Sequence, residues 1–303
     1  MDGRSIQRDF EHIRSFLAER ASADGTDQRR LVYSKEKKGY LLSGERGSLM
    51  TNSEILAVSK ILLESRAFTR GEMEDILDKL IMGCVPLNNI KLVTELIANE
   101  KHHYVELHHQ SHIQDKLWDL GKAIQKCRLL EITYHKQVSS KEIVKRMVEP
   151  MAVLFSEYYF YLNAYIVEPD REGNYKEKYN FPTIFRIDRI VEYHETEETF
   201  HVTYADRFEE GEFRKRVQFM YAGELQHLRI RYTGRNVEAI LDRLPTAEVV
   251  KKEECGYIVE AEVYGKGIIM WLLSQGDNVE VLKPASIREE LKQLLSRMLE
   301  KYE

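Results

Sequence analysis

The sequence predicts an α+β protein of several domains, in which a helix and hairpin lead into a helical linker, a small antiparallel β-barrel and a C-terminal α/β domain. The chain has 303 residues, about twice a typical domain length. Helical spacing of apolar residues dominates up to residue 128, and short strand-like runs are frequent after it. Hydrophobic residues make up 43% and charged residues 31%, as in folded globular proteins. The expected boundaries are 1–48, 49–125, 126–205 and 218–303.

The composition excludes several classes of protein. No run approaches the roughly 18–20 apolar residues of a membrane helix, and no apolar stretch follows Met1 as in a secretory signal. Three widely spaced cysteines, Cys84, Cys127 and Cys255, form neither a disulfide framework nor a paired-cysteine zinc site. We therefore expect a protein of the reducing cytoplasm, with no bound metal or other cofactor.

The first element is a helix over residues 4–20. Its apolar residues recur at helical spacing: Ile6, Phe10, Ile13 and Leu17. Two short apolar runs then flank a charged tip at 35–39, which is typical of a β-hairpin. A helix followed by a basic-tipped hairpin is the second half of a winged helix-turn-helix, in which the helix enters the major groove and the hairpin reaches a phosphate track. Residues 1–50 carry ten Lys and Arg against eight Asp and Glu, whereas the whole chain has a net charge of -5.

Two capping boxes predict two helices over residues 51–83. Thr51 and Glu54 form the first box, and Thr69 and Glu72 form the second. In such a box the hydroxyl and the carboxylate satisfy backbone N–H groups that have no partner inside the helix. These helices carry no chemistry, so we interpret them as a linker or a dimer scaffold.

Five of the ten histidines lie between residues 102 and 112: His102, His103, His108, His109 and His112. The sequence Tyr104–Leu107 between them indicates a strand, so a polar, half-exposed strand is the favoured interpretation. A metal site is the alternative, but no paired acidic or thiolate ligands stand beside these histidines. A further helix is expected over 113–128.

About five short strands follow, with turn residues between them. They are Leu129–His135, Arg146–Phe155, Tyr158–Val167, Phe181–Val191 and Thr199–Thr203. This number of strands over some 75 residues predicts a small antiparallel barrel or sandwich. In the third strand, alternation puts Tyr159, Tyr161, Asn163 and Tyr165 on one face, the candidate surface, and Phe160, Leu162 and Ala164 on the other face, the expected core.

The C-terminal part has the order strand, helix, strand, strand, helix, strand, followed by one more helix. The expected elements are His227–Tyr232, Val237–Leu244, Ala247–Lys251, Tyr257–Val263, Gly267–Ser274 and Asn278–Leu282. This is the ferredoxin-like arrangement. The capping box Ser286–Glu289 opens the last helix, and its regular apolar stripe indicates core or a partner interface.

Several motifs in register resemble a known family. The strand Phe160–Tyr165 followed by Phe185–Ile190 resembles the signature of WYL-domain proteins, with Phe160 in the place of the family's tryptophan. The run Trp271–Pro284 looks like the companion WCX extension. Ser5–Asp9 and Lys38–Leu42 look like the recognition helix and wing of the same regulators. The resemblance covers nearly the whole chain in the family's order.

The resemblance implies a bacterial transcriptional regulator. Its parts would be a truncated winged-helix head, a helical linker, an Sm-like β-barrel WYL domain and a ferredoxin-like WCX domain. The chain begins almost at the recognition helix, where the family has one or two further helices, so Ile6, Phe10 and Ile13 are expected to need another cover.

The WYL domain of such a regulator senses a ligand, and relatives point to nucleic-acid-derived effectors. The candidate effector-binding residues are Tyr134, Arg146, Tyr161, Tyr165, Arg186 and Arg189. A guanidinium can form a fork onto a phosphate, and a tyrosine can stack on a base. The alternative is that the aromatic residues are ordinary sheet residues and that Arg189 pairs with Asp188 or Glu192.

The head supplies the candidate DNA-binding residues. They are Arg4, Ser5, Gln7 and Arg8 on the helix, and Lys35, Lys37 and Lys38 at the hairpin tip. The alternative is a solvated helix face and a charged turn. The expected partners are double-stranded operator DNA, a small anionic or oligonucleotide effector and a second copy in a homodimer, with no membrane involved.

Three hypotheses follow. The first is a ligand-responsive, DNA-binding transcriptional regulator, and the second is a WYL effector-binding accessory protein that does not itself bind DNA. The third, an enzyme, is disfavoured because the chain has no GxSxG, no HExxH and no P-loop, and because Gly265–Gly267 lacks the later glycine of a dinucleotide loop.

Overall fold

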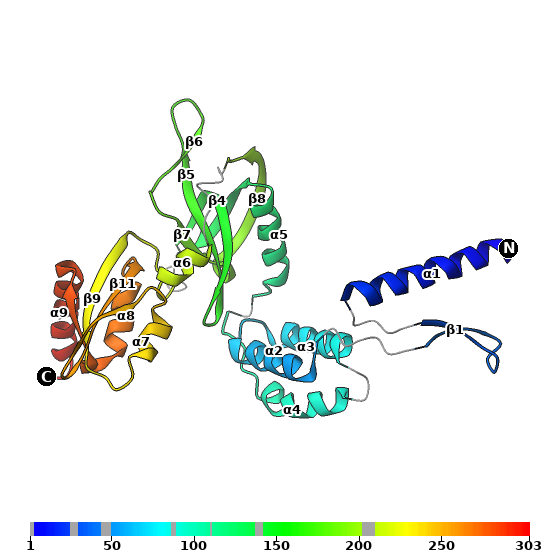
Figure 1. The fold of residues 1–303 in the computed structure, drawn as a ribbon. Coiled ribbons are helices and arrows are strands. Elements are labelled where there is room, and N and C mark those ends of the chain that lie inside the picture. Colours follow the sequence, from blue (N-terminus) through cyan, green and yellow to red (C-terminus); the bar gives the residue numbers. More distant parts are fainter. Residues whose placement is uncertain are drawn as a thin grey trace. The chain divides into compact units, whose positions relative to one another are not determined.

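The computed structural model divides into two compact units, Met1–Ser111 and His112–Glu303, which are described separately (Figure 1). It describes residues 3–24, 30–43, 50–85, 89–109, 111–136, 142–201 and 210–303. No helix in these ranges combines the length and the apolar character that a membrane crossing requires.

The first unit begins with a helix and a two-stranded hairpin, as the sequence predicts. The elements are α1 (Gly3–Asp24), β1 (Arg30–Ser34) and β2 (Gly39–Ser43). Ser34 pairs with Gly39, which leaves four residues for the turn, and Lys38 adopts the left-handed conformation there with φ 48°. The rings of Phe10 and Tyr40 lie 4.2 Å apart and join helix to hairpin.

Apolar side chains of this head stay in contact with water. Phe16 is 55% and Leu42 is 54% exposed, and Ile6 and Ile13 are also exposed. Of the three residues expected to need another cover, Ile6 and Ile13 are exposed, whereas Phe10 is half-buried against Tyr40. The winged helix-turn-helix itself stays a prediction, because a helix and a hairpin are only part of that motif.

Three helices complete the first unit: α2 (Asn52–Ser65), α3 (Arg70–Cys84) and α4 (Ile90–His102). Both predicted capping boxes are present. In the first box the Glu54 N–H donates to Thr51 Oγ1 at 3.2 Å, and the Thr51 N–H donates to the Glu54 carboxylate at 2.7 Å. The helices enclose one apolar core, whose centre includes Ile55, Met73, Leu77 and Ile97.

Loss of the second capping box is expected to loosen α3 by about 1 kcal/mol, because Thr69→Ala removes the hydroxyl that accepts the Glu72 N–H. Hydrogen exchange of the α3 amides in the full chain should accelerate roughly fivefold. Thr94→Ala is the matched control, since Thr94 lies inside α4 and its hydroxyl only donates to the Ile90 carbonyl. Equal acceleration in both variants would contradict a capping role for Thr69.

The strand predicted at Tyr104–Leu107 is wrong, because this segment is irregular. Arginine side chains occupy its backbone carbonyls, which therefore do not pair with another strand: Arg66 Nε donates to the Val105 oxygen at 2.7 Å, and Arg70 Nη2 donates to the Tyr104 oxygen. Tyr104 is buried, and its hydroxyl donates to the Phe68 carbonyl at 2.6 Å. Hydrogen bonds from side chains thus hold this segment in place of a neighbouring strand.

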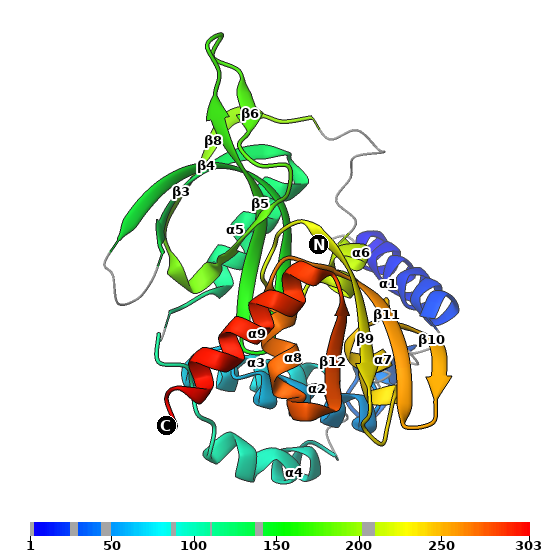
Figure 2. The ribbon, with the colours of Figure 1, turned by 90° about the vertical axis from the view of Figure 1, so that its left-hand side faces the viewer.

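The second unit begins with α5 (Gln114–Gln125) and a six-stranded sheet. The strands are β3 (Arg128–His135), β4 (Ile143–Ser156), β5 (Tyr159–Pro169), β6 (Tyr175–Glu177), β7 (Thr183–Arg186) and β8 (Ile190–Thr199). Their order is β6-β5-β4-β3-β8, and β7 pairs with β5. Figure 2 shows the strong curvature of β3, β4 and β5.

The fourth predicted strand, Phe181–Val191, is wrong as a single element. It is divided by the 3-10 turn Ile187–Arg189, because β7 pairs with β5 whereas β8 pairs with β3. The fifth predicted strand, Thr199–Thr203, is also wrong as a separate element. Strand β8 runs continuously to Thr199, and residues 202–203 lie outside the described ranges. The paired strands form no closed ladder in the described residues, so the Sm-like barrel stays a prediction.

A short helix that the sequence did not predict, α6 (Glu210–Arg216), leads to the C-terminal domain. This domain contains β9 (Leu225–Tyr232), α7 (Glu238–Arg243), β10 (Glu248–Glu253), β11 (Gly256–Tyr264), α8 (Gly267–Ser274), β12 (Val279–Lys283) and α9 (Ala285–Leu299). The four strands lie in the antiparallel order β10-β11-β9-β12 (Figure 2). The predicted βαββαβ order and the final helix are confirmed, but the predicted capping box Ser286–Glu289 is wrong, because the N-cap of α9 is Pro284 and no side chain caps it.

The core of the C-terminal domain lies between the sheet and its helices. Leu228 and Ile230 of β9 pack with Ile240 of α7 and with Ile268 and Trp271 of α8, all of them buried. Alternation along β9 therefore puts apolar residues on one face of the sheet and leaves a charged face opposite.

Candidate effector site

We call α5 and the six-stranded sheet together the middle domain. Arg186 is the centre of the candidate site in this domain. It ends β7, and the 3-10 turn that follows brings Asp188 back toward it. Arg186 Nε and Nη2 donate to the two Asp188 carboxylate oxygens at 3.1 and 2.8 Å. The guanidinium carbon also lies 3.4 Å from the centre of the Tyr159 ring. The Arg186 side chain is 20% exposed and that of Asp188 6%, so the pair is largely shielded from water.

Lys116 of α5 brings a second positive charge to this pair. Its Nζ donates to the Ile190 carbonyl at 2.6 Å. Burial lowers the pKa of Lys116, and the nearby Asp188 carboxylate raises it in part. Burial also disfavours the charged form of Arg186, but the hydrogen bonds and charge of Asp188 hold its pKa above the ordinary value. We call Lys116, Arg186 and Asp188 the Arg186 cluster; its two cations and one carboxylate have a net charge of about +1 at neutral pH.

Two of the predicted tyrosines adjoin this cluster. The hydroxyl of Tyr134 accepts the backbone N–H of Arg186 at 3.4 Å, a long hydrogen bond. Tyr161 lies opposite Arg186 in the β5–β7 pair, with its ring 6.4 Å from that of Tyr159. Burial raises the pKa of Tyr161 to about 12, although the Arg186 charge opposes the shift. The structure therefore brings together Tyr134, Tyr161 and Arg186.

The other three predicted residues have different surroundings. Arg146 Nη1 donates to the Lys145 carbonyl at 3.0 Å. Arg189 Nη1 donates to the Lys136 carbonyl at 3.3 Å, whereas the predicted alternative partner Asp188 binds Arg186. Tyr165 lies opposite Glu149 on β4, and burial and the Glu177 charge raise its pKa. The carboxylates near Tyr165 disfavour an anionic ligand there, so we do not include Tyr165 in the site.

The predicted tyrosine face is not an open surface. Asn163, between Tyr161 and Tyr165 on that face, is completely buried. Phe213 and Val217, in and just after α6, form a small apolar cluster with Ala152 and Leu154, against which Tyr161 packs. This cover was not predictable from the strand pattern, because the sequence did not indicate α6.

In the head, which comprises α1, β1 and β2, the candidate DNA-binding side chains that the structure describes are exposed to solvent. Lys35, Lys37 and Lys38 are exposed in the hairpin turn, where the Lys37 N–H donates to Ser34 Oγ at 3.2 Å. Gln7 and Arg8 are exposed on α1. Arg4 and Ser5 belong to α1, but their side chains lie outside the described part of the chain.

Two further residues of the site were missed in the sequence, each for its own reason. Asp188 stands two residues after Arg186 and was considered only as a partner of Arg189. Lys116 is 70 positions away in the sequence from Arg186, and no local pattern connects them. Within the described ranges, no three His, Cys, Asp or Glu residues come together as metal ligands.

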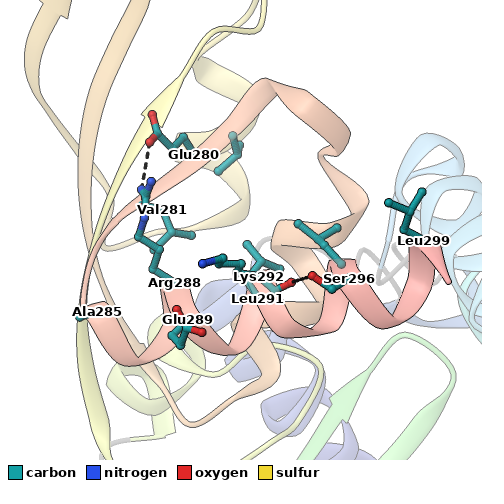
Figure 3. A pocket seen from close by; sticks show the side chains of 11 residues that line it. Glu280, Val281, Ala285, Arg288, Glu289, Leu291, Lys292, Ser296 and Leu299 are labelled. Atoms are coloured by element: carbon teal, nitrogen blue, oxygen red, sulfur yellow. Dashed lines mark hydrogen bonds and ion pairs between the residues drawn. The ribbon is translucent and has the colours of Figure 1, made fainter.

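Two of the hollows in the described part of the C-terminal domain differ in their lining. One, of about 760 Å³, runs along α9 beside β12 and includes Val281, Leu291 and Leu299 (Figure 3). The other, of about 490 Å³, lies on the charged face of the sheet. Its charges are largely paired, as in Arg229–Glu260 at 3.2 Å. Neither hollow includes a residue of the Arg186 cluster.

The raised pKa of Tyr161 predicts an alkaline loss of stability. The neutral form is favoured in the fold, so the full contribution is present below pH 10, the ordinary pKa of a tyrosine, and is lost as pH rises through about 12. The free energy of unfolding of the wild type should fall over this pH range. In Tyr161→Phe the fall should be smaller by about 1–2 kcal/mol, a value that allows for the partial exposure of Tyr161. Urea unfolding at each pH measures this. Tyr302→Phe, at an 88% exposed position, should follow the wild type, and identical curves for all three proteins would contradict the assignment.

Comparison with family models identifies two domains in the chain. A WYL domain matches residues 115–195, from α5 into β8, and a WCX domain matches residues 224–299, from the start of β9 to the end of α9. The Arg186 cluster lies entirely within the WYL match. No curated protein sequence matches this chain.

Two solved structures resemble the chain at low identity. Proteasome accessory factor B/C (PafBC) of Arthrobacter aurescens is 16% identical with a TM-score of 0.32, and the match covers 88% of this chain but 39% of that one. A protein described as CRISPR Cas-related is 14% identical with a TM-score of 0.40, and the match covers 100% of this chain and 74% of that one. This chain thus spans well under half the length of PafBC.

Proposed function

We propose that this chain is a ligand-responsive regulator whose WYL domain binds an anionic, nucleic-acid-derived effector at the Arg186 cluster, and whose head binds double-stranded DNA. The arrangement of Arg186 carries the proposal. Its guanidinium is fixed in one plane by Asp188 and by the Tyr159 ring, so little side-chain freedom remains to be lost on binding.

The charge of the cluster suits an anion. Asp188 neutralises Arg186, and the nearby Lys116, whose Nζ binds the Ile190 carbonyl, adds a second positive charge. A phosphate that approaches the cluster meets a net positive charge in a partly desolvated place, where charge-assisted hydrogen bonds are strong. The neighbouring Tyr134 and Tyr159 provide aromatic rings on which a base can stack.

The head has the chemistry of a nucleic-acid contact. Three lysines in one short exposed turn can reach phosphates, which fix position without reading sequence. Gln7 and Arg8 on α1 can reach base edges. A cytoplasmic homodimer with two-fold symmetry is part of the proposal, because a pair of heads fits a palindromic operator. Effector binding would then change DNA affinity through coupling between two sites.

The test is a binding measurement on the full chain with duplex DNA from upstream of its own gene, with and without an eight-nucleotide single strand. We expect saturable binding of both, with the single strand changing the affinity for the duplex. Binding of the single strand alone would overturn the DNA-binding part and favour the effector-binding accessory protein. Binding of neither would overturn the proposal.

The head makes a separate prediction. Lys37→Ala should weaken binding to all duplexes alike and reduce the salt slope by about one, because it removes a phosphate contact. Gln7→Ala should instead change the preference among duplex sequences. Fluorescence anisotropy over a salt series and a set of sequences distinguishes the two. Sequence-dependent loss in Lys37→Ala would contradict a wing contact.

A further inference from the structure

Asn163 is an unexplained polar residue in the middle domain. It lies on β5 between Ala152 of β4 and Ile184 of β7, and it is completely buried. Within the described residues, neither its amide oxygen nor its amide nitrogen has a hydrogen-bond partner. Buried polar groups in native structures are almost always paired, so an amide with both ends unpaired calls for a reason.

The cover over Asn163 is apolar and supplies no partner. Phe213 and Val217 pack over the β4–β5 face, together with Ile184 and Tyr264. The rings of Phe213 and Tyr264 stack 5.5 Å apart. Asn163 shares its face with Tyr161 because the two residues are two positions apart on one strand. The helix α6 therefore covers both the tyrosine beside Arg186 and the unpaired amide.

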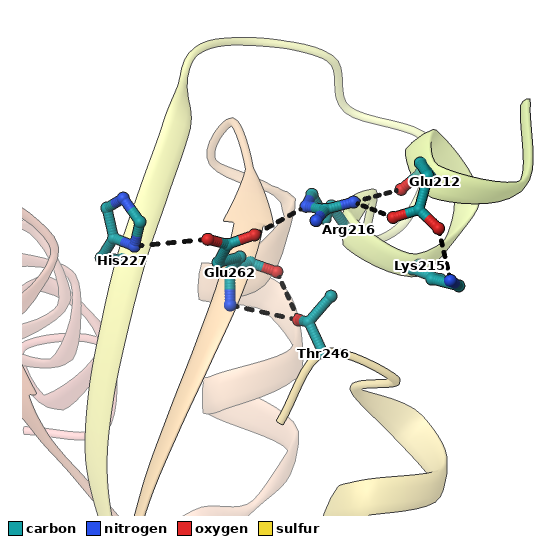
Figure 4. Close-up of polar contacts among 6 residues, drawn as sticks. All are labelled: Glu212, Lys215, Arg216, His227, Thr246 and Glu262. Carbon is teal, nitrogen blue, oxygen red and sulfur yellow. Dashed lines mark hydrogen bonds and ion pairs between the residues drawn. The ribbon is translucent and has the colours of Figure 1, made fainter. Parts of the chain in front are cut away.

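The polar contacts that hold α6 lie at the edge of its apolar contact with the sheet. Arg214 Nη1 donates to the Phe155 carbonyl at 2.6 Å. Arg216 Nε donates to Glu262 of β11 at 2.9 Å, whereas its bond to the Glu212 carboxylate lies within α6 itself (Figure 4). These contacts are partly exposed, and water can replace them when α6 moves.

Two residues that follow α6 have a strained backbone conformation. Phe219 and Met220 follow one another with φ angles of 49° and 54°, a left-handed conformation that is unfavourable for residues other than glycine. The unpaired Asn163 amide disfavours burial under α6. The helix that covers this face has seven residues, and its apolar contact is a small cluster.

We propose that α6 is a displaceable cover over a base-recognition subsite centred on Asn163. The amide presents a donor and an acceptor side by side, which matches a nucleobase edge such as that of adenine. With α6 displaced, Asn163 binds the base edge while the Arg186 cluster binds the phosphate. The identity of this ligand rests on the proposed function, whereas the displacement of α6 does not.

The displacement is tested without ligand, by hydrogen exchange of the α6 amides in the full chain. Asn163→Leu removes the unpaired amide at similar volume, so α6 exchange should slow at least threefold. Arg214→Ala removes one of the polar contacts that hold α6, so α6 exchange should accelerate at least threefold. Exchange within α3 of the first unit is the internal control and should stay unchanged in both. Unchanged α6 exchange in both variants would overturn the cover.

The subsite is tested with two probes that share their phosphates, an eight-nucleotide oligodeoxyadenylate and its abasic analogue. The wild type should bind the first at least tenfold more tightly, Asn163→Leu should bind the two alike, and Arg214→Ala should bind the oligodeoxyadenylate more tightly than the wild type. Equal binding of both probes by the wild type would overturn base recognition by Asn163.

The two proposals fail in different ways. If the exchange rates respond as expected but neither probe binds, the proposed function fails and the cover stands. If Arg186→Ala abolishes probe binding while Asn163→Leu and Arg214→Ala change neither exchange nor affinity, the cover fails and the proposed function stands.

Discussion

Arg186→Ala is expected to lower the affinity of the full chain for an eight-nucleotide single strand by about ten- to a hundredfold. The change removes a guanidinium that Asp188 holds through Nε and Nη2 and that lies on the Tyr159 ring, with Nη1 directed to a phosphate in this proposal. Charge-assisted hydrogen bonds contribute about 1.5–3 kcal/mol each, which corresponds to this range. Fluorescence anisotropy with a labelled strand at one fixed salt concentration measures the effect.

Arg235→Ala is the matched control for this prediction. Arg235 is exposed in the loop between β9 and α7 of the C-terminal domain, and its replacement changes the net charge of the chain equally. Its affinity should stay within about twofold of the wild type, as expected for a screened distant charge. Equal losses in the two variants would show that net charge, and not the Arg186 cluster, governs binding.

Asp188→Ala should lower the free energy of unfolding of the middle domain by about 2–4 kcal/mol. The substitution leaves the 20% exposed Arg186 side chain without the carboxylate that it contacts twice. Loss of one partner of a buried ion pair leaves an uncompensated charge, which costs more than the pair contributes. Hydrogen exchange of the β5 and β7 amides reports this change directly.

Two comparisons make this second prediction specific. Adding Arg186→Met to Asp188→Ala should recover part of the loss, because an apolar side chain removes the stranded charge. Asp277→Ala, in the short turn before β12, should change stability by less than about 0.5 kcal/mol. If Asp188→Ala unfolds like the wild type, the pair has no structural role.

Much of the fold could be predicted from local patterns. The two capping boxes set the starts of α2 and α3 through contacts within four residues. The βαββαβ order followed from the change between periods of two and 3.6. By contrast, the segment after α4 has strand-like residues but binds Arg66 and Arg70 of distant sequence, so local propensity was overridden by tertiary contacts.

The site was only partly predictable. Arg186 and Tyr161 were found through the resemblance, and their pairing across β5 and β7 places them together. Lys116 comes from a helix 70 positions away, which no sequence pattern connects to the strand. Alternation on β5 correctly grouped Tyr161 with Asn163, but it could not show that α6 covers both.

The most direct test of the Arg186 cluster as effector site is photocrosslinking of the full chain to a single strand carrying 5-iododeoxyuridine, with the attachment points mapped by mass spectrometry. Crosslinks should fall on Tyr159, Tyr161 or Tyr134, the aromatic residues around Arg186, and should disappear in Arg186→Ala. Saturable crosslinks confined to the hairpin turn or to the C-terminal domain would contradict an effector site in the middle domain.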